Sequence, residues 1–284
     1  MNYSTLQTLT PPATERRTQT VSPLSRSIIH WFSMQRVTQM VTVLVIAFIL
    51  KYHYSTASVN GLKWILAPTA FLVELVSGVP FVFESHAGYM NADNTFLIAA
   101  PCSGINFLII AFTMLAVGVL WRDRTVQTRW IFMPASLVAA YVSTIIANTV
   151  RIDIALQTRS TGLGSSWMNP EEIHRVEGIV VYFSFLLLLF VVSEVVRAGG
   201  VNGNTLRRLL IPLAIYYAVT LGIPVLMGAF RLPGFWSHSI FVIVTPSLVM
   251  LPLAVCLYAI RFCQQRGVQT HSCLVSNSSN PTLH

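Results

Sequence analysis

The chain has 284 residues, of which 54% are hydrophobic and only 10% are charged. Soluble domains carry about 25% charged residues, so a soluble enzyme and a disordered chain are excluded. Four cysteines in so long a chain also exclude a small secreted domain held by disulfides. The formal net charge of +8 indicates Lys and Arg in cytoplasmic loops, and we predict no nucleic-acid binding. The composition is that of an all-α, polytopic membrane protein.

The chain starts with a polar segment. Residues 1–36 are rich in Thr, Ser and Arg, which predicts a disordered tail. The first apolar run begins near Met40, too far from the start for a signal peptide, and no Ala-x-Ala site follows it. We therefore expect residues 37–260 to form the transmembrane domain, with a polar tail at 261–284 and the lipid bilayer as its surroundings.

The transmembrane domain contains seven apolar blocks. A helix that crosses a membrane needs about 20 mostly apolar residues. The blocks lie at about 37–54, 64–83, 103–121, 130–150, 179–196, 209–230 and 239–260. They predict a helical bundle of about seven to eight spans. The second block carries Glu74, an in-membrane carboxylate whose role stays open.

Arginines between the later blocks orient the chain. They cluster at 122–129, at 197–208 and after the last block, and the three clusters alternate correctly if all are cytoplasmic. The loops 84–102, 151–178 and 231–238 then lie outside. Two spans before residue 84 would place the arginine-containing tail outside as well, against the rule. Either a further short helix lies within 24–60 or one early block does not cross.

Three polar motifs lie at the outer ends of the third, fourth and fifth blocks. They are Ala100-Pro101-Cys102-Ser103-Gly104, Asn148-Thr149-Val150-Arg151 and His174-Arg175-Val176-Glu177-Gly178. Because successive spans are antiparallel, the start, end and start of these blocks reach the same membrane face. A thiol, a guanidinium and an imidazole are thereby predicted to meet.

These side chains form a chemically coherent set. Cys102 is a candidate nucleophile, since Pro101 suits the first turn of a helix and a helix N-terminus favours the thiolate. His174 is a candidate general base and acid. Arg151 can stabilise an oxyanion or bind a substrate carboxylate. Asn148 lies one turn before Arg151 and can orient it or the substrate.

Each of these residues also has a simpler interpretation. A cysteine in a span usually packs as a small hydrophobe, an arginine at a span end usually reaches the interface, and a histidine at a helix start is usually a surface residue. The occurrence of all three residues at one membrane face favours a catalytic role over these simpler interpretations. His86 is the rival base, and Glu177 is interpreted as a partner of the helix dipole. No Cys-x-x-Cys or His-Glu-x-x-His spacing is present, so we predict neither a metal nor a cofactor.

At these motifs the sequence resembles the exosortase/archaeosortase family of membrane-embedded cysteine transpeptidases. The resemblance rests on the Ala-Pro-Cys-Ser-Gly, Asn-x-x-Arg-Ile and His-Arg-Val-Glu-Gly elements and covers about residues 62–200. It implies substrates that are exported proteins with a C-terminal sorting signal, made of a short PEP-type motif, a hydrophobic helix and a basic cluster. It also implies a link to exopolysaccharide export.

The resemblance also implies roles for single residues. Cys102 would form an acyl-enzyme, His174 would be the acid/base and Arg151 the oxyanion or substrate stabiliser. Asn148, Ser103 and Gly104 are expected to bind substrate. A surface, lipid or polysaccharide acceptor would then release the protein at the outer face of the cytoplasmic (inner) membrane.

Two other functions fit the same sequence. One is a non-enzymatic transporter or exopolysaccharide export component, but a transporter is expected to hold its polar residues near the bilayer midplane, whereas here they lie at the boundary. The other is a protease that hydrolyses its acyl-enzyme with water. It uses the same residues as a transpeptidase, so both outcomes stay open.

Overall fold

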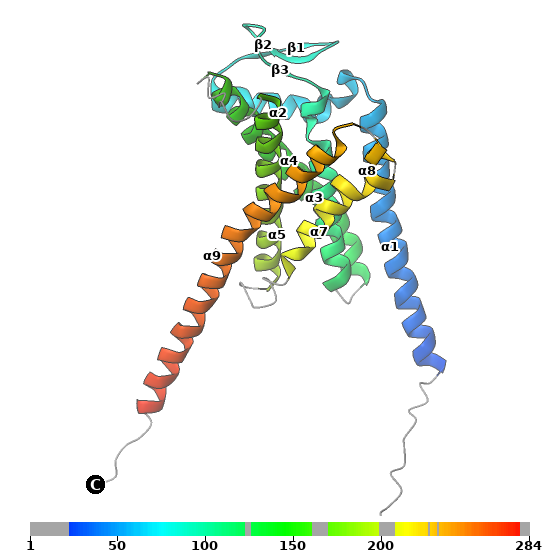
Figure 1. The fold of residues 1–284 in the computed structure, drawn as a ribbon. Coiled ribbons are helices and arrows are strands. Elements are labelled where there is room, and N and C mark those ends of the chain that lie inside the picture. Colours follow the sequence, from blue (N-terminus) through cyan, green and yellow to red (C-terminus); the bar gives the residue numbers. More distant parts are fainter. Residues whose placement is uncertain are drawn as a thin grey trace, which may run out of the picture. The chain divides into compact units, whose positions relative to one another are not determined.

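The computed structural model describes residues 23–122, 126–160, 170–198, 208–226, 228–231 and 233–278 (Figure 1). The chain divides into two units, Met1–Thr38 and Gln39–His284, and the second contains the predicted site. The described part is mostly helical, which confirms the predicted all-α class.

Each predicted block contains a helix, although several helix bounds differ from those of the blocks. The helices are α1 Pro23–Thr56, α2 Lys63–Ser77, α3 Ile105–Arg122, α4 Val126–Ser160, α5 Pro170–Ala198, α7 Leu210–Tyr217, α8 Ile223–Leu226 and α9 Phe235–Ser278. Six helical segments in the described part are long and apolar enough to cross a membrane: Met34–Thr56, Val59–Ser77, Ala100–Leu120, Trp130–Arg159, Glu172–Val196 and Phe235–Cys256. The chain is therefore a multi-pass membrane protein by the length and composition of its helices.

Helix boundaries differ from the predicted domain limits. Helix α1 begins at Pro23, within the segment assigned to the tail, and α9 continues to Ser278, beyond residue 260. Residues 1–22 and 279–284 lie outside the described residues. The sequence analysis placed Arg151 at the end of a helix. In the structure α4 continues to Ser160, so Arg151 lies within the helix instead. The apolar pattern stops near Val150, whereas nothing in the next ten residues breaks a helix.

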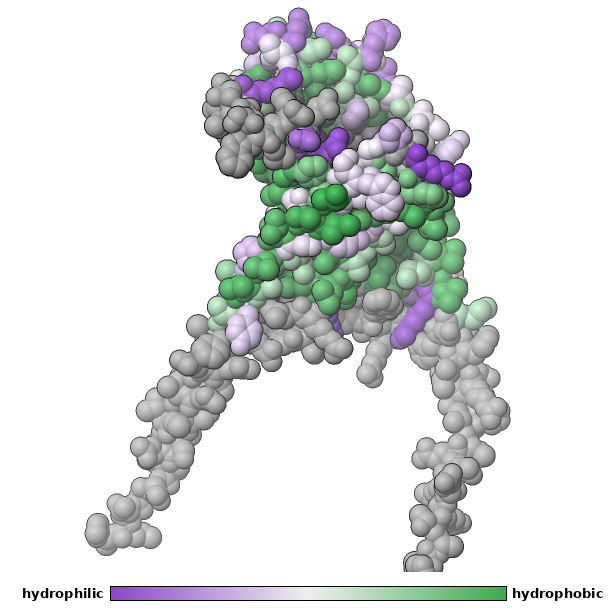
Figure 2. Space-filling view, viewed as in Figure 1, coloured by the Kyte–Doolittle hydropathy of each residue, from purple (hydrophilic) through white to green (hydrophobic). Residues whose placement is uncertain are grey.

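Helix α3 is the centre of the packed part of the second unit. Its residues are apolar on all sides, and most of the apolar segment Ala100–Leu120 is buried, as expected for a helix surrounded by others. It packs against α4, α5 and α7. Helices α1 and α9 instead expose large side chains such as Phe48 and Leu248. Figure 2 shows the resulting hydrophobic band, with hydrophilic residues above it.

The sixth predicted block is interrupted. Residues 209–230 do not form one span but α7, a π-helical turn at Ala218–Gly222 and α8. The apolar helix they make, Leu210–Leu226, is shorter than the six candidate spans. Pro224 explains the break, because its ring cannot donate a hydrogen bond and clashes with the preceding turn. The wider π turn accommodates it.

Helix α2 runs across the bundle. In Figure 1 it lies roughly perpendicular to α3 and α4, and it packs against α4. With the 3₁₀ turn Val59–Leu62 before it, α2 forms the segment Val59–Ser77, which is long and apolar enough to cross a membrane, but it runs across α3 and α4 rather than along them. It ends at Gly78, whose φ of 71° gives a left-handed cap. Of the two alternatives for the early spans, this arrangement favours the block that does not cross.

A small sheet connects α2 to the first motif, and its strands are not predicted by the sequence analysis. Strands β1 Phe81–Glu84, β2 Gly88–Asn91 and β3 Leu97–Ile98 pair antiparallel in the order β1-β2-β3. Residues 81–83 were assigned to the second span and are strand instead. Gly88 is required, since a Cβ there would lie 2.3 Å from the Ile98 carbonyl oxygen. After β3, a 3₁₀ turn at Ala100–Ser103 leads into α3.

Candidate active site

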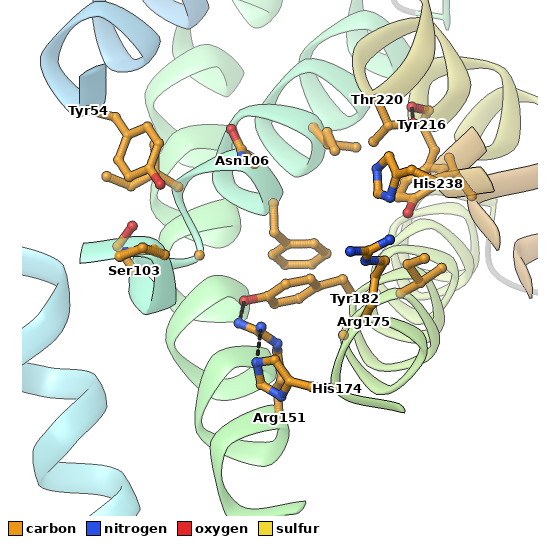
Figure 3. Close-up of a pocket in the computed structure, with 18 residues that line it drawn as sticks. Tyr54, Ser103, Asn106, Arg151, His174, Arg175, Tyr182, Tyr216, Thr220 and His238 are labelled. Carbon is orange, nitrogen blue, oxygen red and sulfur yellow. Dashed lines mark hydrogen bonds between the residues drawn. The ribbon is translucent and has the colours of Figure 1, made fainter. Parts of the chain in front are cut away.

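The three predicted motifs meet at one cavity. It has a volume of about 280 Å³ and is bounded by the end of α1, the 3₁₀ turn, α3, α4, α5, α7, the π turn and α9 (Figure 3). Ser103, Gly104, Arg151 and His174 line it, so each motif contributes to the wall. The structure therefore brings residues of all three motifs to one cavity, including the guanidinium and the imidazole, but the Cys102 thiol is not among the side chains that line it.

Arg151 and His174 are in direct contact. The Nη2 atom of Arg151 lies 2.9 Å from Nε2 of His174. An arginine is always a donor, so Nε2 accepts and a neutral His174 carries its proton on Nδ1. That nitrogen lies 4.0 Å from a Glu177 carboxylate oxygen, and the hydroxyl of Thr158 donates to the other oxygen at 2.9 Å. Glu177 thus faces the imidazole, beyond the helix-dipole role that the sequence predicted.

Tyr182 connects Arg151 to the Cys102 segment. Its hydroxyl donates to Asn148 Oδ1 at 2.8 Å and accepts from Arg151 Nη1 at 3.3 Å. The amide nitrogen of Asn148 in turn donates to the backbone carbonyl of Cys102. Asn148 is fully buried, and it orients the Cys102 backbone directly and Arg151 only through Tyr182. The ring of Tyr182 stacks on Phe107 with centroids 5.2 Å apart.

The sequence analysis missed Tyr182. Its signal was available, because His174, Gly178 and Tyr182 lie at i, i+4 and i+8 on α5 and therefore on one face of the helix. A tyrosine within an apolar run is ordinarily a packing residue, and the run Ile179–Phe190 gave no reason to separate it from its neighbours.

Two glycines make room for these contacts. A Cβ on Gly178 would lie 3.0 Å from Arg151 Nε, so the guanidinium rests directly on the α5 backbone. Gly104 has a φ of 71°, and a Cβ there would lie 3.0 Å from Thr144 Cγ2 and 3.5 Å from the Tyr182 hydroxyl. Both motif glycines are thus explained by close approach, and Gly104 also by its backbone conformation.

Cys102 lies beside the cavity, in the 3₁₀ turn rather than in α3. Its amide donates to the Ala99 carbonyl oxygen at 2.9 Å, and its thiol is free and half-buried. Pro101 occupies the first turn, as predicted, but of the 3₁₀ element. Within the described residues the thiol makes no hydrogen bond to Arg151 or His174, and the cavity wall is formed by its neighbours Pro101 and Ser103.

Two buried polar atoms at this site lack partners. Within the described part of the chain, neither Ser103 Oγ nor Arg151 Nε makes a hydrogen bond. Leaving such an atom unsatisfied costs about 1–3 kcal/mol, and buried groups of this kind call for an explanation. Both residues line the cavity. Arg151 Nε faces the α5 backbone at Gly178, so a ligand would reach Nε or Ser103 Oγ only after a local rearrangement.

Other candidates from the sequence lie elsewhere. His86 is exposed in the turn between β1 and β2 and does not line the cavity. Glu74 is exposed on α2. A further carboxylate, Glu194, is buried near the opposite end of α5, with its Oε2 3.1 Å from Arg208 Nη1. The described residues contain no group of three His, Cys, Asp or Glu that could hold a metal ion. Of the two candidate bases, the structure brings only His174 to the cavity.

Comparisons with protein-family models, with curated proteins and with solved structures find no match to this chain.

Proposed function

We propose that the protein is a membrane-embedded cysteine transpeptidase of the exosortase/archaeosortase kind, acting on C-terminal sorting signals of exported proteins. The observation that carries the proposal is the contact between Arg151 and His174, coupled through Tyr182 and Asn148 to the backbone of Cys102. Packing alone does not require a polar network that joins the three predicted motifs in a membrane protein.

In the first step, the Cys102 thiol transfers its proton to His174 and the sulfur attacks the scissile carbonyl carbon. Arg151 and the free hydroxyl of Ser103 are the donors for the oxyanion. The C–N bond then breaks, and His174 returns the proton to the departing amine. To accept this proton, His174 Nε2 must first lose its hydrogen bond with Arg151. A substrate that binds the guanidinium can break that hydrogen bond. Such rearrangements are common, because catalytic hydrogen bonds often form only in the substrate complex.

In the second step, an acceptor nucleophile attacks the thioester carbonyl. The C–S bond breaks, the acceptor's proton passes to His174, and the Cys102 thiolate is regenerated and reprotonated. Water as the nucleophile gives a protease, and an envelope group gives a transpeptidase. Arg151 is suited to both steps because its planar guanidinium can donate several hydrogen bonds at once.

We assign the reaction to the outer face of the cytoplasmic membrane. The arginine clusters support this, since their cytoplasmic placement leaves the Cys102 motif outside. The sheet that precedes Cys102 supports it as well: its end of the described structure is hydrophilic in Figure 2. A substrate that has already crossed the membrane meets the site there.

The test compares the C-terminus of a protein with a tripartite tail in host membranes that contain the wild type or a variant. We expect Cys102→Ala and Arg151→Ala to abolish processing and His174→Ala to reduce it severely. The control variants Cys256→Ala, Cys263→Ala and Cys273→Ala should process normally. Processing that survives Cys102→Ala would refute the nucleophile. A larger loss in His86→Ala than in His174→Ala would refute the base.

Mass spectrometry of the product separates the remaining alternatives. A new C-terminus joined to an added group establishes transfer, and a free carboxylate establishes hydrolysis. A tail that is unchanged in the wild type as well would return the protein to the transporter or export-component hypothesis.

A further inference from the structure

The cavity has a second polar arm, away from Arg151 and His174. Arg175 from α5, Tyr216 from α7 and His238 from α9 line it, and Figure 3 shows Arg175 between Tyr182 and His238. The proposed chemistry uses none of these three side chains.

The second arm is a set of donors without acceptors. Within the described residues, the side chains of Arg175, His238 and Tyr216 make no hydrogen bond or ion pair. Thr220, which also lines this arm, already donates to the Tyr216 carbonyl at 2.6 Å. No Asp or Glu is among the described residues lining the cavity, which include two arginines and two histidines. The acidic groups nearest along α5 are Glu172 and Glu177, and Glu177 is held by Thr158.

Arg175 lies in the apolar segment Glu172–Val196 and is exposed, so its guanidinium is accessible to a ligand. Ionisable side chains in membrane segments normally pair with one another or with backbone carbonyls, and within the described residues Arg175 has no such partner. A guanidinium, an imidazole and a phenol together match the oxygens of a phosphate, which accepts several hydrogen bonds at once.

The surroundings of the second arm indicate a lipid. Trp236, two residues before His238, is 69% exposed, and tryptophan is enriched at the headgroup level of membranes. Ile240 is 61% exposed and, like Trp236, lies two residues from His238, on the other side of α9. The second arm therefore lies at the depth of the membrane interface, where lipid headgroups are found.

We propose that Arg175, His238 and Tyr216 form a binding site for the phosphate of a phospholipid headgroup, whose acyl chains extend into the surrounding bilayer. The site is independent of the Cys102 chemistry. An inactive Cys102→Ala protein is expected to bind lipid as the wild type does, so failure of this site and failure of the proposed function can be told apart.

The test is native mass spectrometry of the purified full-length chain in detergent, with dioleoylphosphatidylglycerol and with dioleoylglycerol as probes. The two share acyl chains and differ by the phosphate-bearing headgroup. We expect retention of phosphatidylglycerol on the wild type and on Cys102→Ala, about tenfold weaker retention on Arg175→Gln, and partial recovery on Arg175→Lys. Arg231→Gln is the matched control, because Arg231 is exposed and does not line the cavity.

Four results would overturn the proposal. Equal retention of the two probes would exclude headgroup recognition, and equal retention by Arg175→Gln and the wild type would exclude the site. Displacement of the lipid by millimolar inorganic phosphate would assign the site to free phosphate. Arg175-dependent retention of an acidic peptide in place of lipid would assign it to a peptide. Thermal unfolding of each variant in the same detergent shows whether a loss of binding reflects a loss of fold.

Discussion

Tyr182 couples two parts of the site through a single hydroxyl. Tyr182→Phe keeps the stacking on Phe107 but removes the hydrogen bonds to Asn148 and Arg151. We expect processing to fall by about one to two orders of magnitude, and stability to fall by about 1–3 kcal/mol because Asn148 Oδ1 loses its partner. Thermal unfolding and a processing assay on the same membranes measure the two effects.

Tyr141→Phe is the matched control for Tyr182→Phe. Tyr141 also stacks on an aromatic ring, that of Trp64, and its hydroxyl also donates one hydrogen bond, to the Trp64 carbonyl at 2.7 Å. Its removal should leave processing intact. An equal loss of processing in both variants would mean that Tyr182 acts only through stability.

Gly178 tests the position of the guanidinium. In Gly178→Ala the new methyl group would lie 3.0 Å from Arg151 Nε, so Arg151 must move away from His174. We expect processing to drop at least tenfold while the helix persists, since alanine favours helices more than glycine does. Gly222→Ala is the control, because its Cβ meets nothing closer than 3.9 Å. Wild-type activity in Gly178→Ala would contradict the role of the Arg151–His174 contact.

Single residues could be predicted where their chemistry is unusual for a membrane segment. Cys102, Arg151 and His174 stand out as a thiol, a guanidinium and an imidazole at block ends, and Arg151 and His174 line the cavity. Tyr182 and Tyr216 could not be separated from packing residues, because their importance depends on which side chains face them from other helices. The sequence places Arg175 in the His174 motif but gives no separate role for it.

At the scale of elements, the β-sheet sets the approach of the chain to Cys102. Asn91 closes the turn before β3: its side chain donates to Thr95 Oγ1 and accepts from the amides of Thr95 and Phe96, each at 2.9 Å. Asn91→Ala should destabilise this turn by about 2 kcal/mol, with faster proteolysis between β2 and β3 and slower processing. Asp93→Ala, exposed in the same turn, should do neither; if both behave alike, the turn does not position Cys102.

Helices could be predicted where a long apolar block corresponds to a single helix. The blocks that became α3, α4, α5 and α9 are of this kind. The sheet was not predicted, because the strand Phe81–Glu84 follows directly on an apolar helix and extends its hydrophobic run. The break before α8 was not predicted, because Pro224 is a single helix-breaking residue within an otherwise strongly apolar block.

At the scale of the whole molecule, the course of α2 decides the topology. If α2 lies along the membrane surface, α1 is the only crossing before the sheet, and the arginine-containing N-terminus becomes cytoplasmic, as the positive-inside rule requires. In a cysteine-free chain, Ala87→Cys in the β1–β2 turn should react with an impermeant maleimide in intact cells. Ser27→Cys should react only after permeabilisation. Labelling of both in intact cells would mean that α2 crosses.

The central claim, that Cys102 carries the acyl group, is tested most directly by peptide mass spectrometry of the enzyme itself. The purified chain is mixed with a tripartite-tail substrate and quenched in acid within one turnover, and the fragment that contains Cys102 is analysed. We expect a hydroxylamine-sensitive thioester on Cys102 in the wild type and none in Arg151→Ala. Cleavage of the tail with no adduct on Cys102 at any time would contradict it.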